Sequence, residues 1–307
     1  MRKRKSKLTV ILVILAVAVS ALLTFGENLN LPFALPAWDD LFGGAGLTDT
    51  LKDDGTLLSV YFIDVGQGDC TLLKSPGGCV LIDAGEREYG KTVVDTLKAL
   101  SVTRLDYIIA THPHSDHIGG LPDVLNAFTV DNVIMPKLTE RNMQTTAAYE
   151  RFLNAVKRSG AKSTAAQPGA QYELGELVVT LLSPASQSDN LNNMSVVTSV
   201  TYGKTSLLFT GDAESAVEKE LLAGPYSRYL RADVFHAGHH GSRTSNTADF
   251  LGQVAPSLVV ISCGRDNSYK HPHSEAMKRF EGVGAEIRRT DMHGTVVIQS
   301  DGKEIHM

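Results

Sequence analysis

From residue 57 onwards, two kinds of apolar spacing alternate along the chain. Strand-like alternation covers residues 57–65, 69–74, 79–84, 105–110, 131–135, 172–182, 195–202, 206–209, 232–235, 257–262, 286–289 and 295–299. Helical spacing covers residues 91–100, 120–128, 145–159, 214–222, 248–254 and 274–281. Because strand-rich blocks with interspersed helices appear twice, the pattern predicts two β-sheets covered by helices on their outer faces.

The N-terminus has a different pattern, in which a basic head precedes the uncharged run Leu8–Phe25. This run reaches the lower end of what spans a bilayer and also resembles a secretory signal. The basic head holds the N-terminus in the cytoplasm and sends the rest outside. Residues 1–25 are therefore predicted to be a signal peptide or a membrane anchor. The small-residue site Val19–Ala21 lies inside the run, which favours an anchor over cleavage. We expect the following domain to be extracellular, either released or anchored to the cytoplasmic membrane.

Residues 26–55 are rich in proline and glycine and are predicted to form a linker. The short apolar pieces Leu31–Leu35 and Trp38–Phe42 leave open a second interpretation, in which this segment packs on the domain as a strap. Residues 56–307 contain no short repeat and no low-complexity tract. They are predicted to form one domain.

The charge of that domain narrows the function classes. The formal net charge is -5, but five of the 29 basic residues lie before position 8, which leaves 24 basic against 34 acidic residues. Such a body lacks the basic excess of a dedicated duplex-DNA binder. It still allows a substrate whose phosphates are neutralised by metal ions. The three cysteines have no zinc-finger spacing and indicate no disulfide framework.

A metal-ligating pattern follows the predicted strand 105–110. Its four ligand-type side chains fall within six residues: His112, His114, Asp116 and His117. Imidazole and carboxylate together suit Zn²⁺, Mn²⁺ or iron. Alternating ligands on a tight loop can divide into two groups that face two metal ions. The sequence therefore predicts a metal site at this sheet edge.

The His-x-His-x-Asp-His pattern after a strand resembles the metallo-β-lactamase superfamily. The resemblance implies an α/β (α+β) fold, namely an αββα sandwich of two mixed β-sheets flanked by helices, with one or two metal ions at one sheet edge. It further implies that Asp83 supports the histidine loop, that Asp212 bridges both metals, and that His240 completes the second metal in preference to His239. Two ions, Zn²⁺ or Mn²⁺, are the implied cofactors.

Three runs resemble more narrowly the extracellular hydrolase domain of ComEC-type competence proteins: Phe62–Asp69, His239–Ser242 and Tyr269–His273. Those proteins also carry a multi-helix channel, whereas this sequence has one apolar run long enough to span a membrane. The expectation therefore concerns the hydrolase alone.

The sequence departs from the superfamily pattern because no histidine lies between His117 and Asp212. Residues 192–195 resemble the Asn–Ser version found in the ComEC-like branch, which implies supporting roles for Asn193 and Ser195. The first metal would then be held by His112, His114 and Asp212, with water or an asparagine oxygen. More oxygen and less imidazole shifts the preference towards Mn²⁺.

Several residues keep alternative roles at this stage. Asp116 would ligate metal and orient the nucleophile. His239 would ligate metal or donate a proton to the leaving group, and His271 would donate a proton or line the substrate pocket. Ser242 would bind substrate or cap a helix. Asp212 would otherwise cap the helix that follows it.

The resemblance implies an exported two-metal hydrolase, namely a phosphodiesterase or nuclease that uses a metal-bound hydroxide on a phosphoester, with DNA as the candidate substrate. The alternative is a related hydrolase of a small phosphoester such as phosphocholine, a lactone or a thioester. A third interpretation is a non-catalytic binding protein that contains metal. An uncleaved leader would make the membrane a partner, and no protein partner is evident.

Overall fold

The computed structural model describes residues 55–140 and 142–307. The predicted leader, and all of the predicted linker except residue 55, lie outside the described residues, so both stay predictions. Within the described ranges, no helix has both the length and the apolar character needed to cross a membrane.

Within the described residues, one β-sheet has eight strands in the order β15-β14-β1-β2-β3-β4-β5-β6. Its strands are β1 (Leu58–Phe62), β2 (Thr71–Ser75), β3 (Gly78–Ile82), β4 (Arg104–Ile109), β5 (Thr129–Met135), β6 (Lys162–Ala165), β14 (Val296–Ser300) and β15 (Ile305–His306). Strand β1 pairs antiparallel with β14 and β2, whereas β3, β4, β5 and β6 run parallel to one another. The sheet is therefore mixed.

A second sheet has seven described strands in the order β13-β12-β11-β10-β9-β8-β7. They are β7 (Gln171–Leu174), β8 (Leu177–Leu181), β9 (Thr198–Tyr202), β10 (Thr205–Phe209), β11 (Val234–His236), β12 (Leu258–Ile261) and β13 (Glu286–Arg289). Strands β7 to β10 pair antiparallel, and β10 to β13 pair parallel. Each sheet thus combines an antiparallel part with a parallel part.

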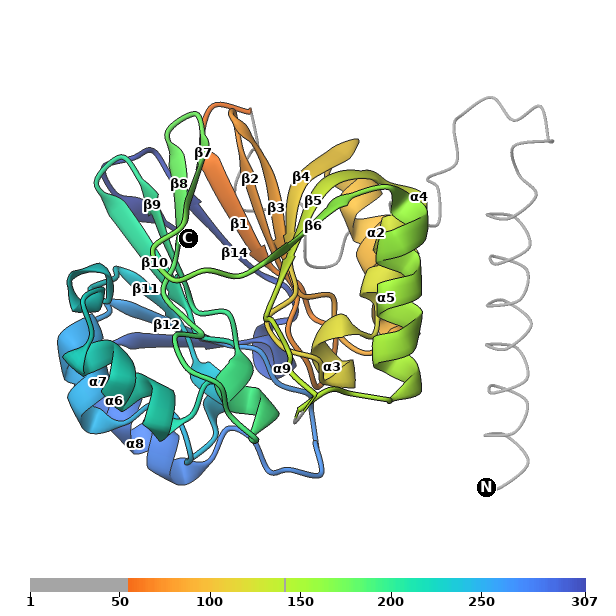
Figure 1. Ribbon diagram of the computed structural model, residues 1–307. Helices are drawn as coiled ribbons and strands as arrows, with labels where there is room; N and C mark the ends of the chain where they lie inside the picture. Colours follow the sequence, from red (N-terminus) through yellow and green to blue (C-terminus); the bar gives the residue numbers. More distant parts are fainter. Residues whose placement is uncertain (1–54, 141) are drawn as a thin grey trace, which may run out of the picture. The chain divides into compact units, whose positions relative to one another are not determined.

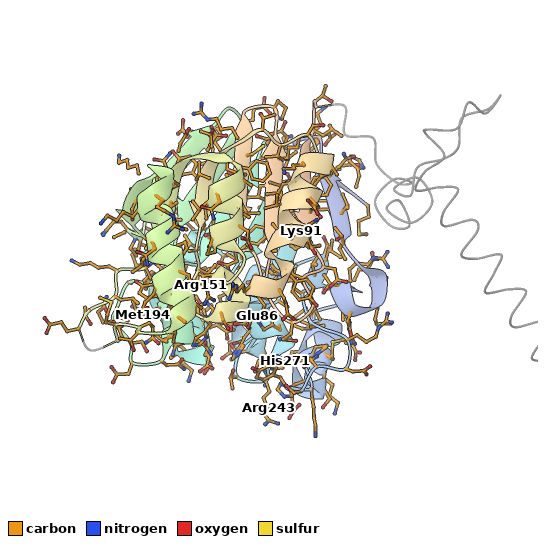
Figure 2. All side chains as sticks on the ribbon, turned by 90° about the vertical axis from the view of Figure 1, so that its right-hand side faces the viewer. Glu86, Lys91, Arg151, Met194, Arg243 and His271 are labelled. Atoms are coloured by element: carbon orange, nitrogen blue, oxygen red, sulfur yellow. The ribbon has the colours of Figure 1, made fainter. Side chains whose placement is uncertain are left out.

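The two sheets lie face to face, with helices on their outer faces (Figure 1). The described helices are α2 (Gly90–Ala99), α3 (Ser115–Ile118), α4 (Leu121–Ala127), α5 (Ala147–Ser159), α6 (Ser215–Ala223), α7 (Ala248–Val254), α8 (Ser274–Gly282) and α9 (Thr290–His293). Short 3-10 turns are η3 (Arg87–Tyr89), η4 (Leu191–Met194), η5 (Ser227–Tyr229) and η6 (Gly238–Gly241). Helices α2, α4 and α5 cover the eight-stranded sheet, with the labelled Lys91 on α2 and Arg151 on α5 in Figure 2, and α6 to α8 cover the other.

Alternation along the strands explains this layering. In β1, Val60 and Phe62 belong to the cluster buried between the sheets, whereas Tyr61 belongs to the cluster under the helices. Phe62 stacks on Phe209 of the opposite sheet, with ring centroids 6.1 Å apart. Successive side chains of a strand point to opposite faces, so apolar residues at both parities bury both faces of the sheet. The predicted αββα sandwich is confirmed.

Two predicted elements differ from the structure. The strand predicted over 172–182 is wrong as a single element, because Gly175 (φ +64°) turns the chain between β7 and β8. The strand predicted over 195–202 begins only at Thr198, because residues 191–194 form the turn η4. Strand β6 was not predicted from the apolar pattern, since its four residues are half-buried or exposed.

The topology brings several strand ends to one edge of the sandwich. In the first sheet, the loop after β3 carries Asp83 and the loop after its parallel neighbour β4 carries residues 111–117. In the second sheet, the loop after β10 carries Asp212 and the loop after its parallel neighbour β11 carries residues 239–240. Loops at the carboxyl ends of parallel strands share one edge, so this edge collects the predicted ligands.

Candidate metal centre

The loop after β4 places two imidazoles deep in the protein. His112 and His117 are buried, and α3 begins at Ser115 within the same loop. The Nε2 of His112 lies 3.0 Å from the Nδ1 of His114. A strand exit followed at once by a single helical turn therefore gathers these side chains within six residues.

Asp83, which directly follows β3, holds this loop in place through hydrogen bonds. Its carboxylate accepts hydrogen bonds from the backbone N–H (2.8 Å) and hydroxyl (2.6 Å) of Thr111. Its Oδ2 also lies 2.8 Å from the Nδ1 of His117. This contact fixes the ring so that Nε2 faces away from Asp83. Asp83 thus contacts both Thr111 and His117 of the histidine loop.

The carboxylate of Asp212 lies at the centre of the imidazoles. Its Oδ1 is 3.2 Å from His117 Nε2 and 3.7 Å from His240 Nε2. Its Oδ2 is 3.6 Å from both His112 Nε2 and His239 Nε2. Helix α6 has Glu214 at its N-cap position, so Asp212 does not serve as the cap. We define the first group as His112 and His114 and the second group as Asp116, His117 and His240, with Asp212 shared between them.

Two consecutive histidines after β11 adopt the left-handed backbone conformation. His239 has φ 52° and ψ 49°, and His240 has φ 54° and ψ 28°. This region is unfavourable for residues with a Cβ and is found chiefly where the surrounding structure enforces it, often at functional sites. Here it brings both rings to Asp212. His240 Nε2 lies 3.3 Å from Asp116 Oδ2, and its Nδ1 lies 3.0 Å from the backbone carbonyl of Ser262.

The charges of the second group compensate one another. Burial alone would lower the pKa of His117, but the carboxylates of Asp212, Asp116 and Asp83 outweigh burial and raise this pKa well above its usual value. The same balance, led by Asp212 and Asp69, raises the pKa of His240. Conversely, burial opposes the charged form of Asp212, but His117, His240 and His112 hold its pKa well below the usual range.

The first group has a different balance. Burial and the neighbouring His117 lower the pKa of His112 well below its usual value, and burial lowers the pKa of His114. The only side-chain oxygens near His112 Nδ1 in the described part of the chain are the hydroxyls of Thr111 (3.1 Å) and Ser195 (3.4 Å). These imidazoles are therefore poised as neutral ligands.

Three buried atoms at the centre have no hydrogen-bond partner among the described residues: His117 Nε2, His240 Nε2 and Asp212 Oδ1. Buried polar atoms are almost always paired, so three that face one another point to a missing cation. Ligand-type atoms also cluster here in groups that fit an ion, including His112 with His117 and Asp212, and Asp116 with His117 and His240. The donor set is the one that divalent transition metals prefer.

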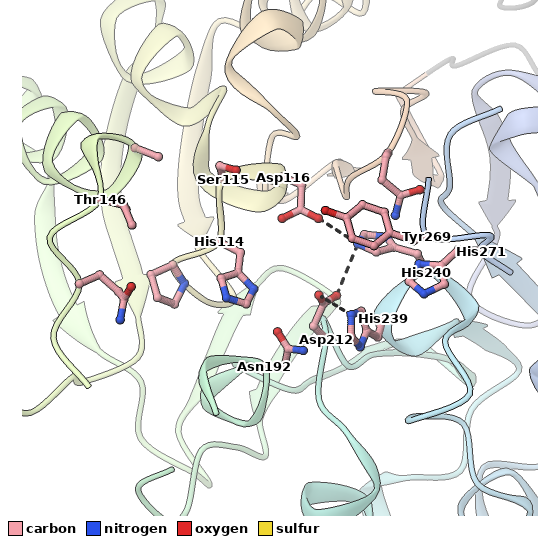
Figure 3. Close-up of a pocket in the computed structure, with 14 residues that line it drawn as sticks. His114, Ser115, Asp116, Thr146, Asn192, Asp212, His239, His240, Tyr269 and His271 are labelled. Carbon is pink, nitrogen blue, oxygen red and sulfur yellow. Dashed lines mark ion pairs between the residues drawn. The ribbon is translucent and has the colours of Figure 1, made fainter. Parts of the chain in front are cut away.

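The centre opens into a pocket of about 390 Å³ (Figure 3). Its lining includes His114, Asp116, Asp212, His239 and His240, and none of the described residues that line it is a lysine or arginine. The rim includes the labelled Tyr269 and His271, whose rings stack with centroids 5.7 Å apart. His271 is buried, and its Nδ1 has no partner in the described structure. Burial and the rings of His240 and His239 lower the pKa of His271 to about 3.

Asn193, Ser195 and Ser242, which were predicted to support the site or bind substrate, lie outside the pocket lining. Asn193 Oδ1 accepts a hydrogen bond from the backbone N–H of Glu214 (3.0 Å). Ser195 Oγ accepts one from the backbone N–H of Asp212 (3.1 Å) and so supports the shared carboxylate. Ser242 is buried and bonds Thr244. Its predicted contact with substrate finds no support in this position.

Sequence reasoning missed Asp69 and Glu214, and of the two asparagines in residues 192–195 it selected Asn193 rather than Asn192. Asp69 is buried, with Oδ1 3.1 Å from His240 Nδ1 and Oδ2 3.8 Å from His236 Nδ1. Its signal was its place at the end of the Phe62–Asp69 run, which suggested only a resemblance. Asn192 and Glu214 each adjoin a residue that was considered, but nothing in the sequence says which neighbour faces the site.

The sequence profile described as "Metallo-beta-lactamase superfamily" matches residues 63–265. "ComE operon protein 3" of Bacillus subtilis (strain 168) is 30% identical over 256 residues, covering 77% of this chain and 32% of that protein. "Competence protein ComA" of Neisseria gonorrhoeae is 30% identical over 290 residues, covering 93% of this chain and 38% of that protein. The chain thus spans 32% and 38% of the lengths of these two curated relatives.

Among solved structures, the metallo-beta-lactamase fold protein YhfI from Bacillus subtilis aligns with a TM-score of 0.52 at 16% identity, covering 80% of this chain and all of that one. This likeness shows the fold. The resemblance predicted from the histidine loop is confirmed by the family match, and its competence-protein branch by the two relatives. The chain belongs to the metallo-β-lactamase superfamily.

Proposed function

We propose that this protein is an exported, metal-dependent phosphodiesterase whose substrate is DNA. The observation that carries the metal-dependent part is the buried Asp212, whose two oxygens face two separate sets of imidazoles. A carboxylate placed in this way is suited to share two ions. The family match supports a hydrolase, and the competence-protein relatives support the choice of DNA.

The chain's own residues would divide the binding of two divalent ions. His112, His114 and Asp212 would hold one, and Asp116, His117, His240 and Asp212 the other. Two divalent ions bound there would lower the pKa of a water molecule towards neutrality and neutralise charge that develops on a phosphoryl oxygen. Asp116 is partly exposed to the pocket, so it is placed to orient that water.

Two imidazoles line the pocket where a leaving group would depart. His239 is the better proton donor, because Glu214 Oε1 lies 3.6 Å from its Nδ1 and orients the ring. His271 has no carboxylate partner, and its lowered pKa keeps it neutral, so we assign it to substrate contact. Proton transfer to the leaving group would then run from His239 Nε2, the atom that faces Asp212.

The residues that line the pocket suit a nucleotide whose phosphate is bound mainly by the metal ions. The described residues that line the pocket include no lysine or arginine, so the ions would meet much of the phosphate charge, which reconciles an acidic body with an anionic substrate. The ring of Tyr269 is 63% exposed at the rim and stacked on His271. Aromatic rings in such positions stack on bases without regard to sequence.

Export is proposed from the apolar run Leu8–Phe25 behind its basic head. The domain would then act outside the cytoplasmic membrane, tethered or released. The whole-protein activities of the longer relatives are not carried over, since this chain matches 32% and 38% of their lengths.

The test is hydrolysis by the purified full-length chain, first metal-free and then with Mn²⁺ or Zn²⁺. Bis(p-nitrophenyl) phosphate is the first substrate and single- and double-stranded DNA the second, with Asp212→Ala beside each. We expect metal-restored cleavage of both substrates, lost in the variant. Cleavage of the small diester without DNA would favour a small-phosphoester hydrolase. No cleavage of either would move the proposal to a lactone, a thioester or a binding role.

A further inference from the structure

The two groups around Asp212 are unequal in number. The second group has three protein ligands besides Asp212. The first has His112 and His114, since His239, whose Nε2 lies 3.6 Å from the same Asp212 oxygen as His112 Nε2, is assigned to proton transfer in the proposed function. The sequence explains the difference, since no histidine occurs between His117 and Asp212. A neutral ligand is therefore missing from the first group, and the segment before Ser195 is where the chain offers one.

Asn192 lies in this segment, on the turn η4 (Leu191–Met194). Its side chain is 9% exposed and lines the same pocket as His114 and Asp212. Figure 3 draws it beside Asp212, at the wall shared with His114. Its Oδ1 is buried and has no hydrogen-bond partner among the described residues. A buried amide oxygen that faces no donor is unusual and suggests a ligand.

The amide orientation follows from its hydrogen bonds. Asn192 Nδ2 donates to Glu214 Oε1 at 3.2 Å, and the Asn192 backbone N–H donates to Asn190 Oδ1 at 3.1 Å. A flipped amide would place Oδ1 against the Glu214 carboxylate, which repels it. Glu214 is itself held by Asn190 Nδ2 (2.9 Å) and the Thr244 hydroxyl (3.2 Å). The carboxylate thus presents the amide oxygen to the pocket.

We propose that Asn192 Oδ1 is a ligand of the first ion and that Glu214 is its positioning residue. The first ion would then have two imidazoles, one carboxylate oxygen and one amide oxygen from the protein. Exchanging an imidazole for an amide oxygen makes the site harder and favours Mn²⁺ or Fe²⁺ relative to Zn²⁺. This inference rests on the metal centre of the proposed function and not on its substrate.

The test counts ions without substrate, on the full-length chain. Metal-free wild type, Asn192→Leu and Asn192→His are titrated with Mn²⁺ by equilibrium dialysis, with electron paramagnetic resonance to report coupled ion pairs. A Zn²⁺–Mn²⁺ competition then follows. Gln67→Leu is the matched control, because Gln67 is another pocket carboxamide, but its oxygen already accepts the Gly264 N–H (3.1 Å).

We expect wild type and Gln67→Leu to bind two Mn²⁺ with a coupled spectrum. Asn192→Leu should keep one ion and bind the other at least about tenfold more weakly, with an uncoupled spectrum. Asn192→His should bind two ions and shift the competition towards Zn²⁺. Glu214→Ala should weaken the same ion, and Glu214→Gln should restore most of the affinity, since its oxygen still accepts from Asn192.

Two coupled Mn²⁺ ions in Asn192→Leu, with affinities within twofold of wild type, would overturn the proposal. If that variant does not fold, an unchanged Zn²⁺–Mn²⁺ preference in Asn192→His would overturn it instead. Wild type that binds two ions but cleaves no diester would refute the proposed function and leave this assignment intact.

Discussion

The two sides of Asp212 differ in what stands behind each imidazole. Behind the second group lie carboxylates, namely Asp83 at 2.8 Å from His117 Nδ1 and Asp69 at 3.1 Å from His240 Nδ1. Behind His112 of the first group lie only the hydroxyls of Thr111 and Ser195. A carboxylate behind a ligating imidazole makes it a stronger donor and fixes its ring. If two ions bind as proposed, the second group should therefore be the stronger site and the first group the weaker, harder one.

This difference suggests that the two ions have different roles. The tighter ion would stay bound and shape the fold of the loops, and the other would exchange more readily with solution. The pKa of His112 is lowered and that of His117 is raised, so acid should weaken metal binding less at the first group than at the second. The predictions below test that inequality.

Removing the ions should have the largest effect on activity and stability, because it empties both metal sites at once. Chelation should reduce hydrolysis of bis(p-nitrophenyl) phosphate to background and lower the melting temperature. An ion present at about 100 times its Kd adds roughly 2.7 kcal/mol to the free energy of unfolding. Calorimetry of the metal-free and Mn²⁺-loaded chain measures this shift. An unchanged melting temperature would show that no ion is bound to the folded state.

Substituting the residues behind each group in turn tests whether the two ions differ in affinity. Asp83→Asn should weaken the tighter ion by about 10–100-fold, since it removes the carboxylate behind His117. Ser195→Ala should weaken the other ion by less than about tenfold, because a hydroxyl at 3.4 Å supports His112 only lightly. Mn²⁺ titration measures both. Equal losses in the two variants would contradict the inequality.

The order in which acid removes the ions tests the same inequality. His117 and His240 have raised pKa values, so both must lose protons to ligate, and proton competition there strengthens as the pH falls. His112 and His114 have lowered pKa values and stay neutral below the usual histidine pKa of about 6.5. The affinity of the second group should therefore fall more steeply with decreasing pH. Mn²⁺ titrations in which both affinities change equally with pH would contradict a difference between the two groups.

The smallest expected effect is on the metal-free fold. The raised pKa of His117 contributes stability that is complete below the unfolded pKa of about 6.5 and is lost as the pH rises through the folded value. The lowered pKa of Asp212 contributes stability above about pH 3.9, lost as the pH falls through its folded value. Both contributions are complete between those limits. His117→Gln should flatten the alkaline side of the stability profile, measured by urea unfolding, and an unchanged profile would contradict this.

The sequence allowed the local part of this centre to be predicted. His112 to His117 lie on one loop, so their spacing alone indicated a metal site, and strand alternation indicated two sheets. Asp212 and His240 came from resemblance, because the contact between strands so far apart in sequence depends on the packed sandwich. The strand predicted over 172–182 failed because apolar spacing does not register the turn at Gly175.

The choice between neighbouring residues could not be predicted. Asn192 and Asn193 are identical residues in the same motif, so the sequence does not distinguish them. The turn η4 points Asn192 into the pocket and lets Asn193 accept a hydrogen bond from the Glu214 backbone N–H. The positions of His239 and His240 depend on two left-handed residues in succession, which sequence preferences disfavour. Asp69 lies behind His240 only once the loop before β2 and the turn η6 meet in the folded protein. Each case needs tertiary structure.

The most direct test of the account is the number of Mn²⁺ ions bound per chain, measured by elemental analysis after dialysis, in wild type and in Asp212→Ala. The account predicts two ions in wild type and no more than one in the variant, because one carboxylate serves both sides. Two ions in Asp212→Ala, or fewer than one in wild type, would contradict a shared two-metal centre.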